Sequence, residues 1–245
     1  MDRKIKVSAV SYLNTKPLLY GIERCPLNDR IELGIEYPAL IARRLQEGTT
    51  DIGLVPVAAI PFIPGARIIS DYGIAADGAV ASVCIFSKVP LEQVKKVYLD
   101  YQSRTSVRLA RLLLEKYWEM DIELLPAPEH YIELINGDTA GVIIGDRALR
   151  HLSDFKYIYD LSAHWKSYTG MPFIFAAWVA YRELPEDFIR QFNEANEYGL
   201  HHLDEIIAAN PYPYYDLHTY YTENIRYRLN EEKHKGLERF LSEIS

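Results

Sequence analysis

The stretch DIGLVPV at residues 51–57 decides the fold of the first half of the chain. A nearly continuous apolar run of this length is typical of a parallel strand whose two faces are both covered by helices. Two further strand-like runs precede it, a β-rich one at residues 5–11 and an alternating one at residues 31–37. A helix is expected after each, beginning at NTKP (residues 14–17) and at Pro38. The order strand, helix, strand, helix, strand predicts an α/β fold with a doubly wound sheet.

The remainder of the chain predicts a second lobe. Long strand-like segments at residues 67–74 and 80–87 are followed by a second series of strands and helices, which ends at residue 144. The apolar run FIFAAWVAY at residues 173–181 is longer than the average strand of ~5–6 residues. From Pro185 onward the pattern is helical throughout. We therefore expect two lobes joined by a double-strand hinge, with a ligand cleft between them.

The expected bounds follow from these segments. Lobe I is expected to comprise residues 1–87 and 177–245, and lobe II residues 88–176. The chain is expected to leave lobe I near residues 87–90 and to return near residues 172–176. Within lobe II the pattern predicts a helix over residues 129–136, and only short helical pieces between residue 146 and the strand at 173.

Composition and charge exclude several classes of function. The 245 residues include 49% hydrophobic and 25% charged side chains, a balance that can bury a real core. The net charge is −7 with no long run of either sign, so neither a nucleic-acid surface nor a basic membrane-binding surface is expected. No stretch approaches the ~20 apolar residues of a membrane span. The apolar part of the N-terminus is too short for a signal peptide, and Cys25 and Cys84 suit a reducing compartment. We therefore expect a soluble, cytoplasmic protein.

Small and polar residues follow the predicted strands, at the carboxyl ends where open α/β sheets bind their ligands. The candidate ligand-binding residues are Ser11, Tyr12, Asn14, Pro56, Val57, Ser82, Ser103, Arg104, Thr105, Ser106, Gly145, Asp146, Thr169 and Gly170.

Several of these positions have two interpretations. Residues 103–106 (SRTS) begin a helix, whose hydroxyls and free N–H groups suit a carboxylate or phosphate, although Ser103 alone would serve as a helix cap. Asn14 could likewise cap a helix or donate its amide to a ligand. Ser82 lies in an apolar strand-like run, where its hydroxyl either bonds backbone or faces a ligand. Asp146 would repel an anionic ligand, which favours a capping role for it.

The residue pattern indicates a binding cleft and not a particular reaction. The seven histidines form no catalytic triad and no metal-binding set, and adjacent residues such as His201 and His202 on a helix cannot face one ligand. The chain has no Gly-rich phosphate loop and no nucleophile elbow. The tyrosines of residues 212–221 are expected to pack rather than to stack on bases, because no basic residues alternate with them.

Residues 10–17 (VSYLNTKP) carry a more specific signal. They resemble the start of the menaquinone-biosynthesis enzymes of the futalosine route, in particular the chorismate dehydratase family. The order of the matching segments is preserved up to about Trp178, whereas the C-terminal helices are similar only in type. The further segments that carry the resemblance are residues 51–57, 78–87, 100–106, 143–149 and 160–175.

The resemblance implies a type II periplasmic-binding-protein fold that is used for catalysis. It implies loss of water from chorismate, a dicarboxylate, to give 3-[(1-carboxyvinyl)oxy]benzoate without a metal or cofactor. It also implies that Asn14 and Ser82 are the catalytic residues. We expect them to orient the leaving hydroxyl and the enolpyruvyl group, while Thr105 and Ser106 hold a carboxylate and the substrate's own enolpyruvyl carboxylate takes the proton. No partner other than the substrate is expected, except a possible second copy of the chain.

Three alternatives stay open at this point. The related 1,4-dihydroxy-6-naphthoate synthases are similar in fold, but they place a His-Glu pair where this chain has Gly145 and Asp146. A non-catalytic solute-binding protein would share the fold, since fold does not fix function, although the absence of a signal peptide argues against it. A ligand-sensing effector domain would normally carry a DNA-binding segment, and no helix-turn-helix precedes Lys4.

Overall fold

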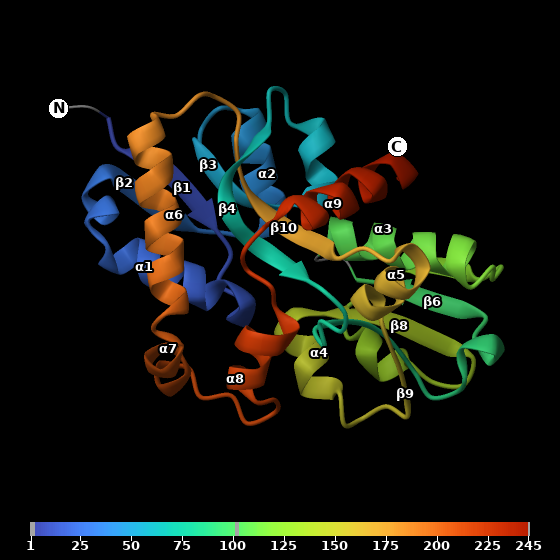
Figure 1. Ribbon diagram of the computed structural model, residues 1–245. Coiled ribbons are helices and arrows are strands. Elements are labelled where there is room, and N and C mark those ends of the chain that lie inside the picture. The colour runs from blue at the N-terminus through green and yellow to red at the C-terminus, as the bar shows by residue number, and fades with distance from the viewer. Residues whose placement is uncertain (1–2, 101–102, 245) are drawn as a thin grey trace. The chain divides into compact units, whose positions relative to one another are not determined.

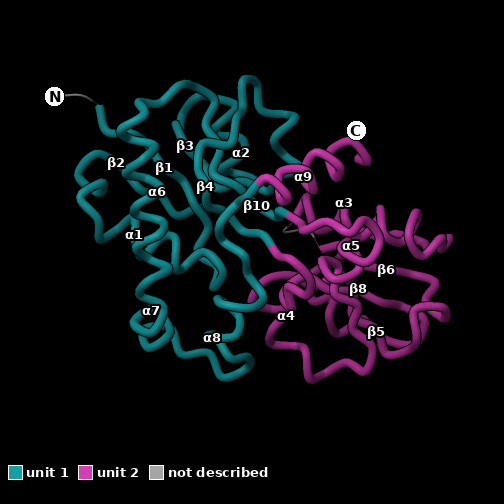
Figure 2. Tube along the Cα trace, in the orientation of Figure 1, with its two compact units in different colours: residues 1–75, 174–230 teal, residues 76–173, 231–245 magenta. Residues whose placement is uncertain are grey.

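The computed structural model describes residues 3–100 and 103–244 of the chain (Figure 1). Its contacts divide the chain into two compact units (Figure 2). The first unit comprises Met1–Ala75 and Ile174–Asn230, and the second comprises Ala76–Phe173 and Glu231–Ser245. Each unit is built around one five-stranded sheet. The expectation of an α/β protein built from two sheets is therefore confirmed.

The first sheet has the strand order β2-β1-β3-β10-β4. Strand β1 pairs in parallel with β2 and β3, whereas β10 runs antiparallel to β3 with Ala176 opposite Pro56. The strands predicted at residues 5–11, 31–37 and 51–57 are β1, β2 and β3. The strands of this sheet are β1 (Ile5–Ala9), β2 (Ile31–Ile35), β3 (Ile52–Pro56), β4 (Arg67–Ala76) and β10 (Phe173–Ala180).

Helix α2 packs on this sheet, and the helical pattern predicted from Pro185 onward is present as several separate helices and turns. The helices of the first unit are η1 (Leu13–Thr15), α1 (Lys16–Arg24), η2 (Pro26–Arg30), α2 (Pro38–Gln46), η3 (Val57–Phe62), α6 (Glu186–Leu200), α7 (Leu203–Ala209), α8 (Leu217–Thr219) and η7 (Tyr220–Asn224).

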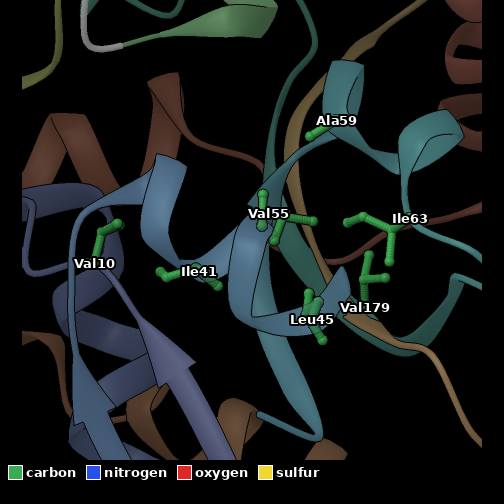
Figure 3. Packing of buried hydrophobic residues seen from close by; sticks show 8 residues of the cluster. Val10, Ile41, Leu45, Val55, Ala59, Ile63 and Val179 are labelled. Carbon is green, nitrogen blue, oxygen red and sulfur yellow. The ribbon is translucent and has the colours of Figure 1, made fainter. Parts of the chain in front are cut away.

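The apolar run at residues 51–57 forms the middle of the first core. Ile41 and Leu45 of α2 pack with Val55 of β3 and Val179 of β10 in one buried cluster (Figure 3). Gly53 makes this close packing possible, because a Cβ atom there would lie 2.5 Å from Cγ2 of Ile41. The continuous apolar character of the strand therefore reflects burial on both of its faces.

Helices α1 and α6 lie side by side with their backbones in direct contact (Figure 1). A Cβ on Gly21 would lie 1.7 Å from the carbonyl oxygen of Ala195, and a Cβ on Gly199 would lie 1.7 Å from that of Pro17. No side chain fits at either glycine without separating the two helices. This close approach attaches the segment after β10 to the N-terminal part of the chain.

The second sheet has the order β7-β6-β8-β5-β9 and repeats the pattern of the first. Strand β6 pairs in parallel with β7 and β8, and β5 runs antiparallel to both β8 and β9. Strand β9 was not expected, because only short helical pieces were predicted for its segment. The strands of this sheet are β5 (Val83–Ser87), β6 (Lys96–Leu99), β7 (Glu123–Pro126), β8 (Thr139–Ile144) and β9 (Tyr157–Asp160).

The second unit also differs from the sequence prediction in one helix. The helix predicted over residues 129–136 is a single turn, because Pro128 precedes it and His130 adopts a left-handed φ of 58°. No helix in the described ranges is both long enough and apolar enough to cross a membrane. The helices of this unit are η4 (Leu91–Gln93), α3 (Arg104–Leu112), η5 (Leu113–Tyr117), η6 (Tyr131–Leu134), α4 (Gly145–His151), α5 (Leu161–Thr169) and α9 (Glu231–Glu243).

The bounds of the units differ from the expected lobes at three places, one of which is the assignment of residues 174–176 to the first unit. Residues 76–87 belong with the second unit, because β5 pairs with β8 and β9. The C-terminal helix α9 also belongs there, because Phe240 packs edge-on against Phe173, with 4.8 Å between the ring centroids. The chain therefore passes between the units after Ala75, before Ile174 and after Asn230. The ligand cleft expected between two lobes stays a prediction.

A buried carboxylate stabilises the first sheet at the point where its central strand β3 begins. Asp51 has no exposed surface, and it accepts hydrogen bonds from Nε of Arg182 at 2.8 Å and from the backbone N–H of Lys6 at 2.9 Å. Arg3 donates to both of its oxygens, at 2.7 and 2.9 Å. The carboxylate therefore joins β1, β3 and the end of β10 through charge-assisted hydrogen bonds.

Replacing this carboxylate is expected to destabilise the protein. Asp51→Ala would leave two guanidinium groups and one backbone N–H without their acceptor, and we expect the free energy of unfolding to fall by about 2–4 kcal/mol. Urea denaturation followed by circular dichroism measures this change. The exposed Asp29 is a matched control, and Asp29→Ala should change the free energy by less than about 0.5 kcal/mol. Equal losses in the two variants would contradict the assigned role.

Candidate functional site

The predicted site residues are distributed over both units. Ser11, Tyr12, Asn14, Pro56 and Val57 lie in the first unit, at or after the ends of β1 and β3. The others lie in the second unit, and they are Ser82, Ser103, Arg104, Thr105, Ser106, Gly145, Asp146, Thr169 and Gly170.

Asn14 lies in the short helix η1 that follows β1. Its side-chain oxygen accepts a hydrogen bond from Thr15 Oγ1 at 3.2 Å, and its backbone carbonyl accepts one from the Tyr227 hydroxyl at 2.9 Å. Burial raises the pKa of Tyr227 well above its ordinary value, so this hydroxyl stays a proton donor. The residue that caps α1 is Thr15, so the capping role considered for Asn14 is wrong. Within the described residues its Nδ2 makes no hydrogen bond, which leaves an amide donor for a ligand.

The other predicted site residues of the first unit differ in their exposure and in the groups that they could present to a ligand. Ser11 is exposed and accepts a hydrogen bond from Lys16 Nζ at 3.2 Å, whereas Tyr12 packs partly against the core cluster of the first unit. Pro56 ends β3 and is half-buried. Val57 has no exposed surface, so the structure as it stands offers no group of this residue to a ligand.

Ser82 and Gly145 are brought together in the second unit. The backbone N–H of Gly145 donates to the carbonyl of Ser82 at 2.7 Å, and Ser82 is 1% exposed. Gly145 has a φ of 62°, and open space lies where its Cβ would be. The apolar run predicted that Ser82 lies inside a strand. In the structure it lies in the turn directly before β5. Its backbone N–H closes that turn by donating to Val80 O at 2.7 Å.

A residue that sequence reasoning missed lies beside this turn. Oδ2 of Asp160 accepts hydrogen bonds from the N–H groups of Val80 at 2.8 Å and Ala81 at 2.7 Å. The other oxygen caps α5. An Asp before a helical segment is a sequence signal for an N-cap, but that signal does not point to the turn. Burial, and secondarily the negative charge of Asp160, raise the pKa of the Cys84 thiol well above its ordinary value, so this thiol stays protonated.

The start of α3 is arranged as a cap. Ser103 Oγ accepts the backbone N–H of Ser106 at 3.0 Å and lies 2.9 Å from the Ser106 hydroxyl. The capping interpretation of Ser103 is therefore confirmed. Thr105 and Ser106 are buried, whereas Arg104 is exposed. The buried hydroxyls of Thr105 and Ser106 are the groups of this segment that suit a desolvated carboxylate.

The remaining predicted residues are located at helix ends. Asp146 lies in the first turn of α4, and the cap position is taken by Ile144, so the capping role considered for Asp146 is wrong. Thr169 Oγ1 donates to the Trp165 carbonyl at 2.8 Å and accepts the N–H of Met171 at 3.2 Å. Gly170 ends α5 with a left-handed φ of 75°, as is common for glycine at this position. Thr169 and Gly170 therefore have a structural role, which is to end α5.

A buried carboxylate braces the strand end that precedes α3. Asp100 directly follows β6 and is 2% exposed. Its Oδ2 lies 2.6 Å from Arg147 Nη2 and 3.0 Å from the Tyr131 hydroxyl, which is also 2.7 Å from the Val142 carbonyl. Since Arg147 belongs to α4, these contacts connect the end of β6 to the helix that begins with Gly145. In the described ranges no group of three or more His, Cys, Asp or Glu could hold a metal ion.

Removing one hydroxyl tests this brace. Tyr131→Phe deletes the donor shared by Asp100 and Val142, and we expect the free energy of unfolding to fall by about 1–2 kcal/mol. Tyr98 is a matched control, because its ring packs edge-on against that of Tyr131 at 6.2 Å. Tyr98→Phe should change stability by less than about 0.5 kcal/mol in the same urea titration. A Tyr131→Phe protein as stable as the wild type would contradict the bracing role.

The sequence of the chain matches proteins of menaquinone biosynthesis. The family described as menaquinone biosynthesis matches residues 5–245. A chorismate dehydratase of Thermus thermophilus is 29% identical over 235 residues, which cover 83% of each chain. A chorismate dehydratase of Campylobacter jejuni is 25% identical over 239 residues, which cover 95% of this chain and 94% of the relative.

Solved structures show the same fold at much lower identity. Protein AF1704 of Archaeoglobus fulgidus has a TM-score of 0.78 at 16% identity, covering 98% of this chain and 96% of its own. The periplasmic aliphatic sulphonate binding protein SsuA of Escherichia coli has a TM-score of 0.64 at 14% identity, with coverage of 99% and 91%. The predicted periplasmic-binding-protein-like fold is confirmed by these structures. Because the family match extends over residues 5–245, the chain belongs to the menaquinone biosynthesis family.

Proposed function

We propose that this protein is a chorismate dehydratase, a carbon–oxygen lyase that removes water from chorismate to give 3-[(1-carboxyvinyl)oxy]benzoate. The observation that supports this most strongly is the match to two relatives of that name over 83% and 95% of the chain, within a family match of residues 5–245. The cytoplasmic location expected from the sequence stays a prediction.

The proposed reaction needs few protein groups. The C–H bond at the ring carbon that carries the enolpyruvyl ether is acidified through the neighbouring double bond by the ring carboxylate. When this bond breaks, its electrons form the new ring double bond, and the C–O bond of the adjacent hydroxyl group breaks. The released hydroxide takes up a proton and leaves as water, and the ring becomes aromatic. Donors that stabilise the charge building on the ring carboxylate would lower the barrier.

The residues assigned to this chemistry are neutral. Asn14 offers its Nδ2 donors in the first unit, and Ser82 offers a nearly inaccessible hydroxyl in the second. In the proposal these two orient the leaving hydroxyl and the enolpyruvyl group of chorismate. Neither amide nor hydroxyl is a base near neutral pH. The substrate's own enolpyruvyl carboxylate is therefore assigned as the proton acceptor.

Thr105 and Ser106 are assigned to a substrate carboxylate. Both hydroxyl groups are buried at the start of α3, where the partial positive charge of the helix N-terminus favours an anion. The carboxylate of Asp146 lies in the first turn of α4 and would repel an anionic substrate unless it is protonated or paired. A dianionic substrate is thus matched to hydroxyl and amide donors, rather than to a salt bridge.

The test is incubation of the purified protein with chorismate, with products separated by chromatography and identified by mass spectrometry. We expect 3-[(1-carboxyvinyl)oxy]benzoate to form, and Asn14→Ala and Ser82→Ala to lower kcat by at least about 100-fold each. Matched controls are Asn210→Ala, which removes a half-buried side-chain hydrogen bond in the first unit, and Ser87→Ala, which removes a buried hydroxyl at the other end of β5. Near-normal turnover in both site variants would contradict the assignment, and chorismate bound but unchanged by the wild type would contradict the proposed reaction.

The carboxylate assignment has its own test. Thr105→Val keeps the shape of the side chain and removes its hydroxyl, so we expect KM for chorismate to rise by about 10-fold while kcat changes less. Steady-state kinetics on the purified variants measures both constants. Thr49→Val, at an exposed position before β3, is the control and should leave KM unchanged. A Thr105→Val enzyme with normal KM would show that this hydroxyl does not bind the substrate.

A further inference from the structure

The turn that precedes β5 has a costly backbone conformation. Ala81 has a φ of 60°, in the left-handed region that a residue with a Cβ rarely adopts, and Gly78 has a φ of 114°. A left-handed conformation is unfavourable for a residue other than glycine. Ser82 follows immediately, and its N–H closes the turn on Val80 O at 2.7 Å. This conformation persists only if neighbouring groups stabilise it.

One carboxylate oxygen supplies that stabilisation. Oδ2 of Asp160 accepts the N–H groups of Val80 and Ala81, at 2.8 and 2.7 Å. Successive N–H groups that converge in this way form a concave site for an anion. A carboxylate accepts hydrogen bonds about twice as strongly as a neutral group. The turn is therefore held by a charge that comes from β9, 80 residues further along the chain than Val80.

The second oxygen of Asp160 is occupied elsewhere. Oδ1 accepts the N–H groups of Ser162 and Ala163 at 3.0 Å each, and so caps α5. Burial raises the pKa of the Asp160 carboxyl from its ordinary value, whereas the four backbone donors act in the opposite direction. A helix cap alone would need only one acceptor oxygen, as Ser103 shows at α3. The two oxygens thus have separate structural tasks.

The backbone N–H and the backbone carbonyl of Ser82 are both held by hydrogen bonds. Its N–H belongs to the turn that Asp160 holds, and its carbonyl accepts the N–H of Gly145 at 2.7 Å. Asp160 also lies opposite Cys84 in the pairing of β9 with β5, so the carboxylate is anchored to the strand that directly follows Ser82.

We infer that Asp160 is a positioning residue, which holds the 78–82 turn in its left-handed conformation and thereby sets the direction of the Ser82 hydroxyl. The inference rests on the proposed function in one respect, namely that Ser82 acts on chorismate. The contacts of Asp160 with the turn do not depend on that function.

Asp160→Asn separates the two tasks. The amide oxygen of Asn can still cap α5, but its NH₂ group would face the N–H groups of Val80 and Ala81 without accepting from them. We expect kcat on chorismate to fall by about 100-fold, because small displacements of a reacting group have effects of this size, and KM to change by less than about 3-fold. Amide hydrogen exchange should become faster in residues 78–84 and stay unchanged in residues 161–169.

Two further variants make the test specific. Ala81→Gly accepts the left-handed conformation at little cost, so in the Asp160→Asn background it should recover about 10-fold of the lost kcat. Asp216→Asn is the matched control, since Asp216 caps α8 through Thr219 in the first unit, whereas the turn belongs to the second. It should leave kcat and the exchange of residues 78–84 unchanged. If Asp160→Asn does not fold, Asp160→Ser keeps a capping hydroxyl, and the same results are expected of it.

The outcomes distinguish this inference from the proposed function. Unchanged exchange in residues 78–84 of Asp160→Asn would show that Asp160 does not hold the turn. Faster exchange with normal kcat, or no recovery in the double variant, would show that the turn does not position a reacting group. If the wild type leaves chorismate unchanged, the proposed function fails, and the exchange measurement alone still decides whether Asp160 anchors the turn.

Discussion

The rest of the structure depends on the insertion of one antiparallel strand beside three parallel strands in each sheet. In the first sheet β10 pairs with β3, with Ala176 opposite Pro56, and in the second sheet β5 pairs with β8, with Val83 opposite Ile144. Strand β10 joins the βαβ series of the first sheet only after the chain has formed the second sheet, whereas β5 directly precedes the series of the second sheet. The chain passes between the units more than once, and the predicted site residues Ser82 and Gly170 lie shortly before β5 and β10.

Buried carboxylates hold the ends of three strands in place, namely β3, β6 and β9. Asp51 joins the start of β3 to two arginines, Asp100 joins the end of β6 to Arg147 and Tyr131, and Asp160 joins the end of β9 to the turn before β5. In each case the charge is satisfied by guanidinium, hydroxyl or backbone donors, as buried ionised groups require. Charged side chains therefore maintain the framework, while the groups proposed to meet the substrate are an amide and several hydroxyls.

Neutral donors at the site and charged side chains in the framework suit a substrate such as chorismate, which carries two carboxylates. A periplasmic-binding-protein-like fold by itself does not distinguish an enzyme from a binding protein, since SsuA of Escherichia coli shares it at 14% identity. The family match over residues 5–245 makes the difference here, and the neutral donors agree with the dehydration proposed for chorismate. Catalysis of this kind would depend on the precision with which donors such as Asn14 and Ser82 are held, more than on their acid–base strength.

The sequence by itself determined the features that depend on neighbouring residues. Apolar runs locate β1, β3 and β10, because burial on both faces of a strand leaves a local pattern, and the serine before α3 identifies its cap. The matching segments from residue 10 onward also led to the family from sequence alone.

Only the tertiary structure decided what depends on residues distant in the chain. Strand β9 is four residues long and half-buried, and it exists because β5 pairs with it, not because its own pattern predicts a strand. The assignment of β5 and α9 to the second unit, the left-handed turn at Ala81 and the role of Asp160 follow from such contacts. A carboxylate that stabilises N–H groups 80 residues away leaves no periodic signal, because each partner alone is compatible with many folds.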